Sequence, residues 1–231
     1  MKNKSFIENT FVAGNKTITV FSSDAFSRPI IYLNTFAEKG IQVYQALRNA
    51  NCQDFILVAI SGLDWNHDMS PWVIPPISNR EPPCTGGADD YLQLLTKEII
   101  PRAEGYMQGG PAWRGLAGYS LAGLFAVYSM YQTDHFARIA SISGSLWFPE
   151  FKEYAVSHEI RGKPEHLYLS LGDKEYKTRN PYLKTIQDNT EELAAFYREQ
   201  QIDTEFHLNP GNHYKEALER TTAGIAWLLN R

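Results

Sequence analysis

Cysteine, long apolar stretches and clustered positive charge are all scarce in this 231-residue sequence. Cys52 and Cys84 are the only cysteines, which is too few for a disulfide framework. No segment approaches the roughly 18 apolar residues of a membrane-spanning helix, and the opening MKNKSFIENTF lacks the apolar stretch of a signal peptide. We therefore expect a soluble, cytoplasmic protein with free thiols.

The charge balance also excludes some classes of partner. The formal net charge is −4 and no run of lysine or arginine occurs, whereas nucleic acids and anionic membranes require a concentrated positive face. A small molecule is the expected partner, with neither nucleic acid nor membrane involved. With 43% hydrophobic residues the chain can bury a large core, and its length favours one α/β domain over residues 1–231.

Strand-like and helix-like patterns alternate along the chain. Runs rich in β-branched and aromatic residues predict strands at 16–23, 28–36, 54–60, 113–118, 137–143, 165–172 and 203–209. Apolar residues at helical spacing predict helices at 41–48, 91–104, 121–131, 183–200 and 215–229. This alternation predicts an α/β fold with a mostly parallel sheet and helices on both faces.

One long irregular stretch, residues 61–88, holds five of the twelve prolines. So long a loop in a compact domain usually belongs to a binding site. Trp72 in this stretch and Trp147 after a later strand are candidates for the substrate pocket, although both could equally be core residues. His67 and Asp68 could suggest a metal, but no second ligand pair accompanies them, so we expect no metal site.

The segment RGLAGYSLAGLFAVY, residues 114–128, predicts a strand, a sharp turn and a helix with Ser120 at the joint. Small residues at 118 and 122 let the backbone turn tightly, which exposes the serine hydroxyl as in a nucleophile elbow. The Leu121 N–H then lies free at the start of a helix, where it can stabilise an oxyanion. The alternative is a serine that only caps the helix.

The residues that a serine nucleophile needs follow in a suitable order. Asp173 and Glu175 come just after one predicted strand, and His213 comes just after the next. A histidine can take the serine proton, while a carboxylate orients the imidazole. Residues 173 and 175 would point to the same side of an extended segment, so alternation alone leaves both carboxylates open as the acid.

Several of these motifs together resemble a known family. GGADDYLQLLTKEIIPRAE, WRGLAGYSLAGLFAVYS, FARIASISGSLWF, LYLSLGDKE and PGNHY resemble the Putative esterase family of α/β-hydrolases, which includes esterase D, feruloyl esterases, and enterochelin and salmochelin esterases. The resemblance runs from about residue 29 to the C-terminus. It implies an α/β-hydrolase fold without a large lid domain.

The resemblance also implies roles for individual residues. The family's serine falls on Ser120, its histidine on His213, and its acid, three residues after the strand-ending glycine, on Glu175. Some siderophore esterases of this type use a serine–histidine dyad instead. Ala122 replaces the second elbow glycine, and YLNTF stands where many members have a strand ending in His-Gly. By position, the N–H of Phe36 is the expected second oxyanion donor.

These observations predict a serine esterase that cleaves a small-molecule carboxylic ester through an acyl-enzyme, with no cofactor. A thioesterase or acyltransferase could use the same machinery, because only the acyl acceptor or leaving group differs. A non-catalytic binding module on the same fold is the third alternative. The presence of a serine, an acid and a histidine in order favours the enzymes.

Overall fold

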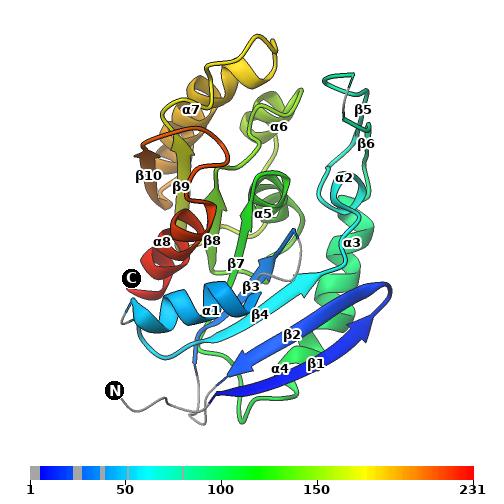
Figure 1. Cartoon of the computed structure of the whole chain (residues 1–231), viewed down its shortest axis with the longest axis vertical. Helices are drawn as coiled ribbons and strands as arrows, with labels where there is room; N and C mark the ends of the chain where they lie inside the picture. The colour runs from blue at the N-terminus through cyan, green and yellow to red at the C-terminus, as the bar shows by residue number, and fades with distance from the viewer. Residues whose placement is uncertain (1–5, 23–27, 37–39, 51, 80) are drawn as a thin grey trace.

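An eight-stranded sheet forms the centre of the structure, a computed structural model that describes residues 6–22, 28–36, 40–50, 52–79 and 81–231. The strand order is β1-β2-β4-β3-β7-β8-β9-β10 (Figure 1). The strands are β1 (Ile7–Ala13), β2 (Lys16–Ser22), β3 (Ile30–Asn34), β4 (Ile56–Ser61), β7 (Arg114–Tyr119), β8 (Arg138–Ile142), β9 (His166–Gly172) and β10 (Asp203–Asn209). In this spatial order, every neighbouring pair from β4 through β3 to β10 is parallel, while β1 and β2 are antiparallel to their neighbours. The predicted mostly parallel sheet is confirmed.

Both faces of the central strands are buried, as their apolar sequences predict. Successive side chains of a strand point to opposite faces, and in β4 Ile56, Val58 and Ile60 join one hydrophobic core. Leu57 and Ala59 join a second core on the other face. A strand that serves two cores has no polar face, which explains its continuous apolar run.

Helices cover each face. The helices α1 (Gly40–Asn49) and α8 (Ala217–Leu229) contact each other and pack over one core. The other core lies under α3 (Ala88–Leu94), the π-helical turn η1 (Leu95–Ile99), α4 (Ile100–Glu104), α5 (Leu121–Gln132), α6 (Phe151–Ser157) and α7 (Ile186–Glu199). The exposed 3-10 turn η2 (Leu183–Thr185) leads into α7. Helices on both faces are therefore confirmed, and the described residues form no separate lid domain.

Two local predictions differ from the structure. The sequence pattern missed β1, because most of its side chains are exposed and it carries no apolar run. The helix predicted at 91–104 is interrupted by η1, where the Ile100 N–H bonds to the carbonyl of Leu95 five residues earlier. Pro101 follows near the start of α4, and because it has no N–H to donate, one bond of the helical ladder is missing there.

The irregular stretch 61–88 contains some regular secondary structure. Residue 80 of this stretch, and residue 23 at the end of a predicted strand, lie outside the described residues. It includes the short helix α2 (Trp65–Asp68) and a small hairpin of β5 (Val73–Ile74) and β6 (Cys84–Thr85). Asp68 forms a buried ion pair with Lys16 of β2, with 2.6 Å between Nζ and Oδ2. This pair ties the stretch to the first hairpin of the sheet.

Parallel strands bring four chain segments to one edge of the sheet. The carboxyl ends of β3, β7, β9 and β10 meet there, and the loops that follow them carry Phe36, Ser120, Glu175 and His213. Ligands of open α/β sheets bind at this edge. The fold therefore gathers the predicted residues that are far apart in the sequence.

Candidate active site

Ser120 occupies a strained turn between β7 and α5. Its φ of 59° and ψ of −125° lie in a region that non-glycine residues rarely adopt. The turn is fixed by the Ser120 N–H, which donates to the Ile142 carbonyl at 3.1 Å. A Cβ on Gly118 would lie 2.3 Å from the carbonyl oxygen of Ala122, so the turn requires glycine there. The predicted sharp turn is present.

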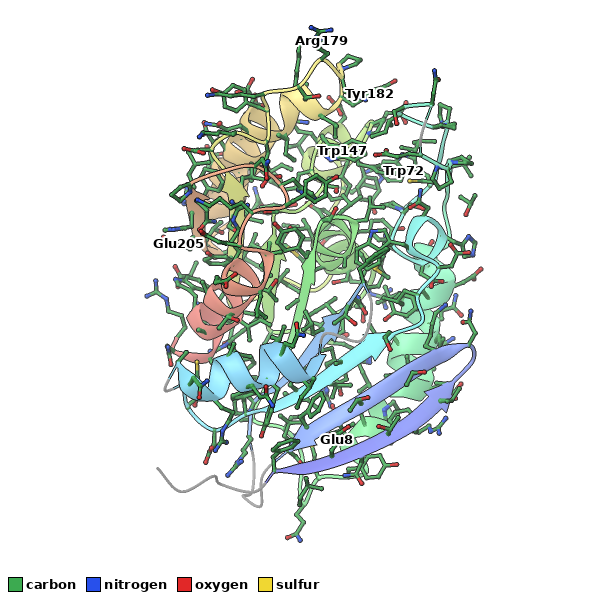
Figure 2. All side chains as sticks on the ribbon, in the orientation of Figure 1. Glu8, Trp72, Trp147, Arg179, Tyr182 and Glu205 are labelled. Carbon is green, nitrogen blue, oxygen red and sulfur yellow. The ribbon has the colours of Figure 1, made fainter. Side chains whose placement is uncertain are left out.

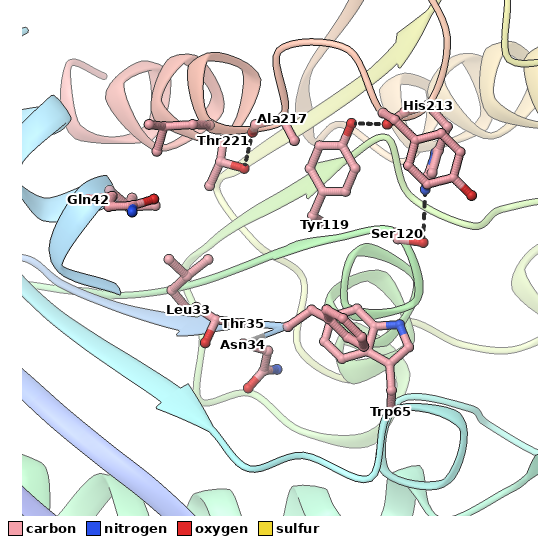
Figure 3. A pocket seen from close by; sticks show the side chains of 14 residues that line it. Leu33, Asn34, Thr35, Gln42, Trp65, Tyr119, Ser120, His213, Ala217 and Thr221 are labelled. Atoms are coloured by element: carbon pink, nitrogen blue, oxygen red, sulfur yellow. Dashed lines mark hydrogen bonds between the residues drawn. The ribbon is translucent and has the colours of Figure 1, made fainter. Parts of the chain in front are cut away.

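His213 and Glu175 continue a chain of hydrogen bonds from Ser120. The His213 Nε2 lies 3.1 Å from the Ser120 hydroxyl (Figure 3). Its Nδ1 lies 2.7 Å from Oε2 of Glu175. The same imidazole therefore bridges the hydroxyl and the carboxylate, which is the geometry of a nucleophile, a general base and an orienting acid.

Asp173, the other candidate acid, points elsewhere. Its Oδ1 accepts the Gly211 N–H at 2.7 Å, which ties together the loops after β9 and β10. Only Glu175 reaches the imidazole, because the loop after Gly172 turns its side chain back toward the strand end. There the other carboxylate oxygen, Oε1, accepts the Gly172 N–H at 2.6 Å.

A buried arginine lies behind the Glu175 carboxylate. Arg220 of α8 donates from Nη1 to Oε1 of Glu175 at 3.3 Å, and the two side chains are 2% and 5% exposed. The same guanidinium donates to the Ser143 hydroxyl at 3.2 Å and to the Pro210 carbonyl at 3.1 Å. Arg220 thus connects the carboxylate with the loop that carries the histidine.

The charge state of Glu175 follows from these contacts. Burial raises the pKa of this carboxyl, but the hydrogen bond and charge of His213 together with the Gly172 N–H outweigh burial and hold the pKa below its ordinary value. Glu175 is therefore ionised near neutral pH, as an orienting acid must be.

Tyr119 fixes the backbone of the histidine loop. Its phenol donates to the His213 carbonyl at 2.5 Å. Burial raises the pKa of Tyr119 above its ordinary value, so the donor proton is retained. The loop that carries His213 is thereby anchored to the strand that precedes Ser120.

Both expected oxyanion donors lie beside Ser120. Leu121 is the first residue of α5, and neither its N–H nor that of Phe36 has a hydrogen-bond partner among the described residues. The Phe36 side chain is 69% exposed and meets the Trp65 ring edge-on at 5.2 Å. Phe36 and Ser120 share the lining of two cavities.

Two cavities open at Ser120 and His213. The narrower cavity, about 370 Å³, lies between β3, α1 and α8, with Leu33, Val43 and Leu218 in its wall. The wider cavity, about 560 Å³, lies between the stretch 61–88 and the loop after β9. A scissile bond at Ser120 would therefore have space on two sides.

The sequence as a whole matches one family. The family described as "Putative esterase" matches residues 21–222. The chain belongs to this esterase family. Its membership supports a hydrolase of esters and confirms the family resemblance carried by the motifs around Ser120, Glu175 and His213.

Individual relatives of the esterase are distant. The uncharacterized protein YbbA of Bacillus subtilis (strain 168) is 21% identical over 236 residues, which cover 95% of this chain and 94% of YbbA. Siderophore hydrolase EstA from Aspergillus nidulans has a TM-score of 0.77 at 19% identity, covering 97% of this chain and 94% of EstA. An IroE-like serine hydrolase from Shewanella oneidensis has a TM-score of 0.78 at 16% identity, covering 98% of this chain and 80% of its own. These structures share the fold, so the predicted α/β-hydrolase class is confirmed.

The two tryptophans predicted for the substrate pocket of the esterase occupy different environments. Trp147 lines the wider cavity. Trp72 lies at the same end of the molecule (Figure 2) but is not among the residues that line either cavity. Its indole N–H donates to the Pro149 carbonyl at 3.2 Å, and its ring packs on Phe148. Trp72 therefore packs within the wall, and its role in the substrate pocket stays a prediction.

His67 and Asp68 of the esterase are used within the wall. The Nδ1 of His67 lies 2.8 Å from the Thr85 hydroxyl, and Asp68 pairs with Lys16. Across the described ranges, no group of three or more His, Cys, Asp or Glu side chains could hold a metal ion, and no helix there is long and apolar enough to cross a membrane.

Sequence reasoning missed the supporting residues of this esterase site. Arg220 holds both the acid loop and the histidine loop, and Tyr119 holds the histidine loop. Ser145 places its hydroxyl 3.4 Å from that of Ser120. Arg220 falls in an amphipathic helix, where a charged residue usually faces water. Only the fold brings it under the acid loop, so no sequence signal identifies it.

Proposed function

We propose that the chain is a serine esterase that hydrolyses a carboxylic ester of a small molecule, with its machinery in a single α/β-hydrolase domain over residues 1–231. The observation that carries the proposal is the unbroken hydrogen-bond chain from Ser120 through His213 to Glu175. Family membership supports the ester chemistry.

The first half of the reaction acylates the serine. His213 removes the hydroxyl proton as the Ser120 Oγ attacks the ester carbonyl carbon, which forms a tetrahedral oxyanion. The N–H groups of Leu121 and Phe36 donate to this oxyanion, and the first of them lies at the positive end of α5. The intermediate collapses, the C–O bond to the alcohol breaks, and His213 returns the proton to the leaving oxygen.

The second half releases the acid. A water loses a proton to His213 and attacks the acyl carbon, and the Ser120 oxygen leaves with that proton. In both halves Glu175 keeps the imidazole in the tautomer with Nδ1 protonated and stabilises the imidazolium. Arg220 touches no reacting atom and acts as a positioning residue for Glu175.

A covalent probe tests this proposal. A fluorophosphonate is expected to label the wild type on Ser120, as read by mass spectrometry of the labelled peptide. Ser120→Ala is expected to fold, to lose the label and to lose p-nitrophenyl acetate turnover by roughly three or more orders of magnitude. The matched control Ser145→Ala removes the neighbouring hydroxyl and is expected to keep the label on Ser120. Comparable turnover by Ser120→Ala would refute the proposal.

A substrate screen tests the bond that is cleaved. Carboxylic esters are expected to be hydrolysed in preference to matched thioesters, and water is expected to be the acceptor even when an alcohol is added. Ester-linked siderophores belong in the screen, because EstA is described as a siderophore hydrolase. Preferred thioester cleavage, or transfer to the alcohol, would reassign the chain to the thioesterase or acyltransferase alternative.

A further inference from the structure

The narrower cavity extends away from Ser120 along the surface between β3, α1 and α8. Figure 3 shows Ser120 and His213 at one end, Leu33 near the middle, and Gln42 of α1 at the opposite end. Ala217 and Thr221 lie along the α8 side. A group attached to a carbonyl at Ser120 could therefore extend along this cavity without leaving the site.

Among the described residues, the wall of the narrower cavity carries no Asp, Glu, Lys or Arg side chain. Two of its hydroxyls are used internally, since the Thr221 hydroxyl donates to the Ala217 carbonyl at 2.7 Å and the Thr35 hydroxyl donates to the Ile60 carbonyl at 3.0 Å. The buried Nδ2 of Asn34, by contrast, has no hydrogen-bond partner among the described residues. Hydrogen bonds that are already made leave an apolar surface for a ligand.

The wider cavity has the opposite character. Lys174 and Lys177 line it, together with Glu81 and Glu175. One cavity with charged side chains in its wall and one with none among the described residues thus diverge from one serine. An ester with one apolar half and one polar half matches both walls, because a charged group is strongly disfavoured where no opposite charge compensates its loss of water.

The size of the narrower cavity limits the group it can hold. Its volume is about 370 Å³, and an apolar cavity of about 150 Å³ is already enough for a benzene molecule. A phenyl ring or a six-carbon chain therefore fits.

We propose that the narrower cavity binds an uncharged apolar arm of the ester, of about the size of a phenyl group or a six-carbon chain, while the polar half occupies the wider cavity. This inference rests on the proposed esterase function. The apolar arm can belong to the acyl or to the alcohol half of the ester, and the experiment distinguishes the two.

Two series of esters test the inference. The acyl series is p-nitrophenyl acetate, butyrate and hexanoate; the alcohol series is ethyl, butyl and hexyl acetate, followed by acid release in a pH-stat. Each buried methylene is expected to raise kcat/KM about fourfold. The hexyl-length substrate should therefore exceed the shortest by roughly two orders of magnitude in the series whose arm enters the cavity.

Leu218 supplies the variants, because its side chain lines the cavity from α8. Leu218→Trp fills the space and is expected to lower the long-to-short ratio to below about tenfold. Leu218→Ala enlarges the space and is expected to keep the ratio within about threefold of wild type or raise it. The control is Ala223→Trp on the exposed side of the same helix, which should leave the ratio unchanged. Because the long and short substrates are measured on the same preparation of each variant, the ratio of their kcat/KM values does not depend on the fraction of protein that is folded.

The charge of the arm provides a second reading. In whichever of the two series shows the rise of kcat/KM with chain length, a carboxylate at the end of the six-carbon arm is expected to cancel most of that rise. Equal rates for the charged and uncharged arms would overturn the selection against charge.

Failure of the inference and failure of the esterase function give different results. A wild type that a fluorophosphonate labels on Ser120, but whose ratios do not respond to Leu218→Trp in either series, overturns the inference alone. The same change of ratio in Ala223→Trp also overturns it. A wild type without label or turnover overturns the proposed function.

Discussion

Replacing Arg220 by methionine should destabilise the protein far more than the same replacement at the surface. Arg220→Met keeps a long apolar side chain but removes the guanidinium that bonds to Glu175, Ser143 and Pro210. The Glu175 carboxylate, 5% exposed, then loses its cationic partner. Removing one partner of a buried ion pair leaves an uncompensated charge and typically costs about 3–5 kcal/mol.

Arg48 provides the matched control. It pairs with Asp54 at 3.1 Å, and the two side chains are 24% and 46% exposed. Arg48→Met is expected to cost less than about 1 kcal/mol, because water screens such a pair. The assay is urea unfolding at pH 7, supported by thermal melts, in which Arg220→Met should lower Tm by about 6–20 °C.

A double-mutant cycle isolates the pair itself. In a Glu175→Gln background no carboxylate is left without its cation, so the cost of Arg220→Met should fall by about 1–3 kcal/mol. If Arg220→Met costs no more than Arg48→Met, or costs the same in both backgrounds, the described role of the guanidinium is refuted.

Further predictions concern the acid, pH and metals. Glu175→Gln should lower kcat by about two to four orders of magnitude and Asp173→Asn by less than about tenfold; the reverse ranking would move the role to Asp173, and two near-neutral variants would favour a dyad of Ser120 and His213. The kcat/KM of p-nitrophenyl acetate should rise with pH as one histidine loses its proton, and a flat profile between about pH 5 and 8 would contradict a histidine base. The pKa of Glu175 is lowered in the folded state, so its contribution to stability is complete above the unfolded pKa and is lost as pH falls through the folded value. The stability difference between wild type and Glu175→Gln in acid titrations should therefore shrink with falling pH, and a constant difference would count against the lowered pKa. Activity should be unaffected by EDTA; a loss that zinc restores would implicate a site at His67.

Most of the sheet was predictable because its strands are buried on both faces. In β4, alternate residues serve two cores, so the sequence there is apolar throughout and easy to recognise. β1 is an edge strand with mostly exposed side chains, and its pattern carries no such signal. The π-helical turn before Pro101 also depends on local hydrogen bonding rather than on periodicity.

The three residues of the hydrogen-bond chain were predictable for a different reason. Parallel topology brings strand ends to one edge, so Ser120, Glu175 and His213 could be expected together from their chain order. The choice of Glu175 over Asp173 came from the family spacing, because alternation leaves both open. Arg220 could not be expected, since its burial depends on how the loops after β9 and β10 cross over α8. The position of Trp72 in the wall could not be expected, because the path of a long loop is set by tertiary contacts.

Lys16 and Asp68 also constrain the order in which the chain can fold during its synthesis. Lys16 leaves the ribosome well before Asp68 is made, yet its ammonium is buried only against that carboxylate. Docking the first hairpin earlier would bury an unpaired charge, which costs several kcal/mol. We therefore expect the hairpin to join the sheet only once α2 has been made. A nascent chain arrested before residue 68 should leave the amides of β1 and β2 open to hydrogen exchange, and a chain arrested well after α2 should protect them.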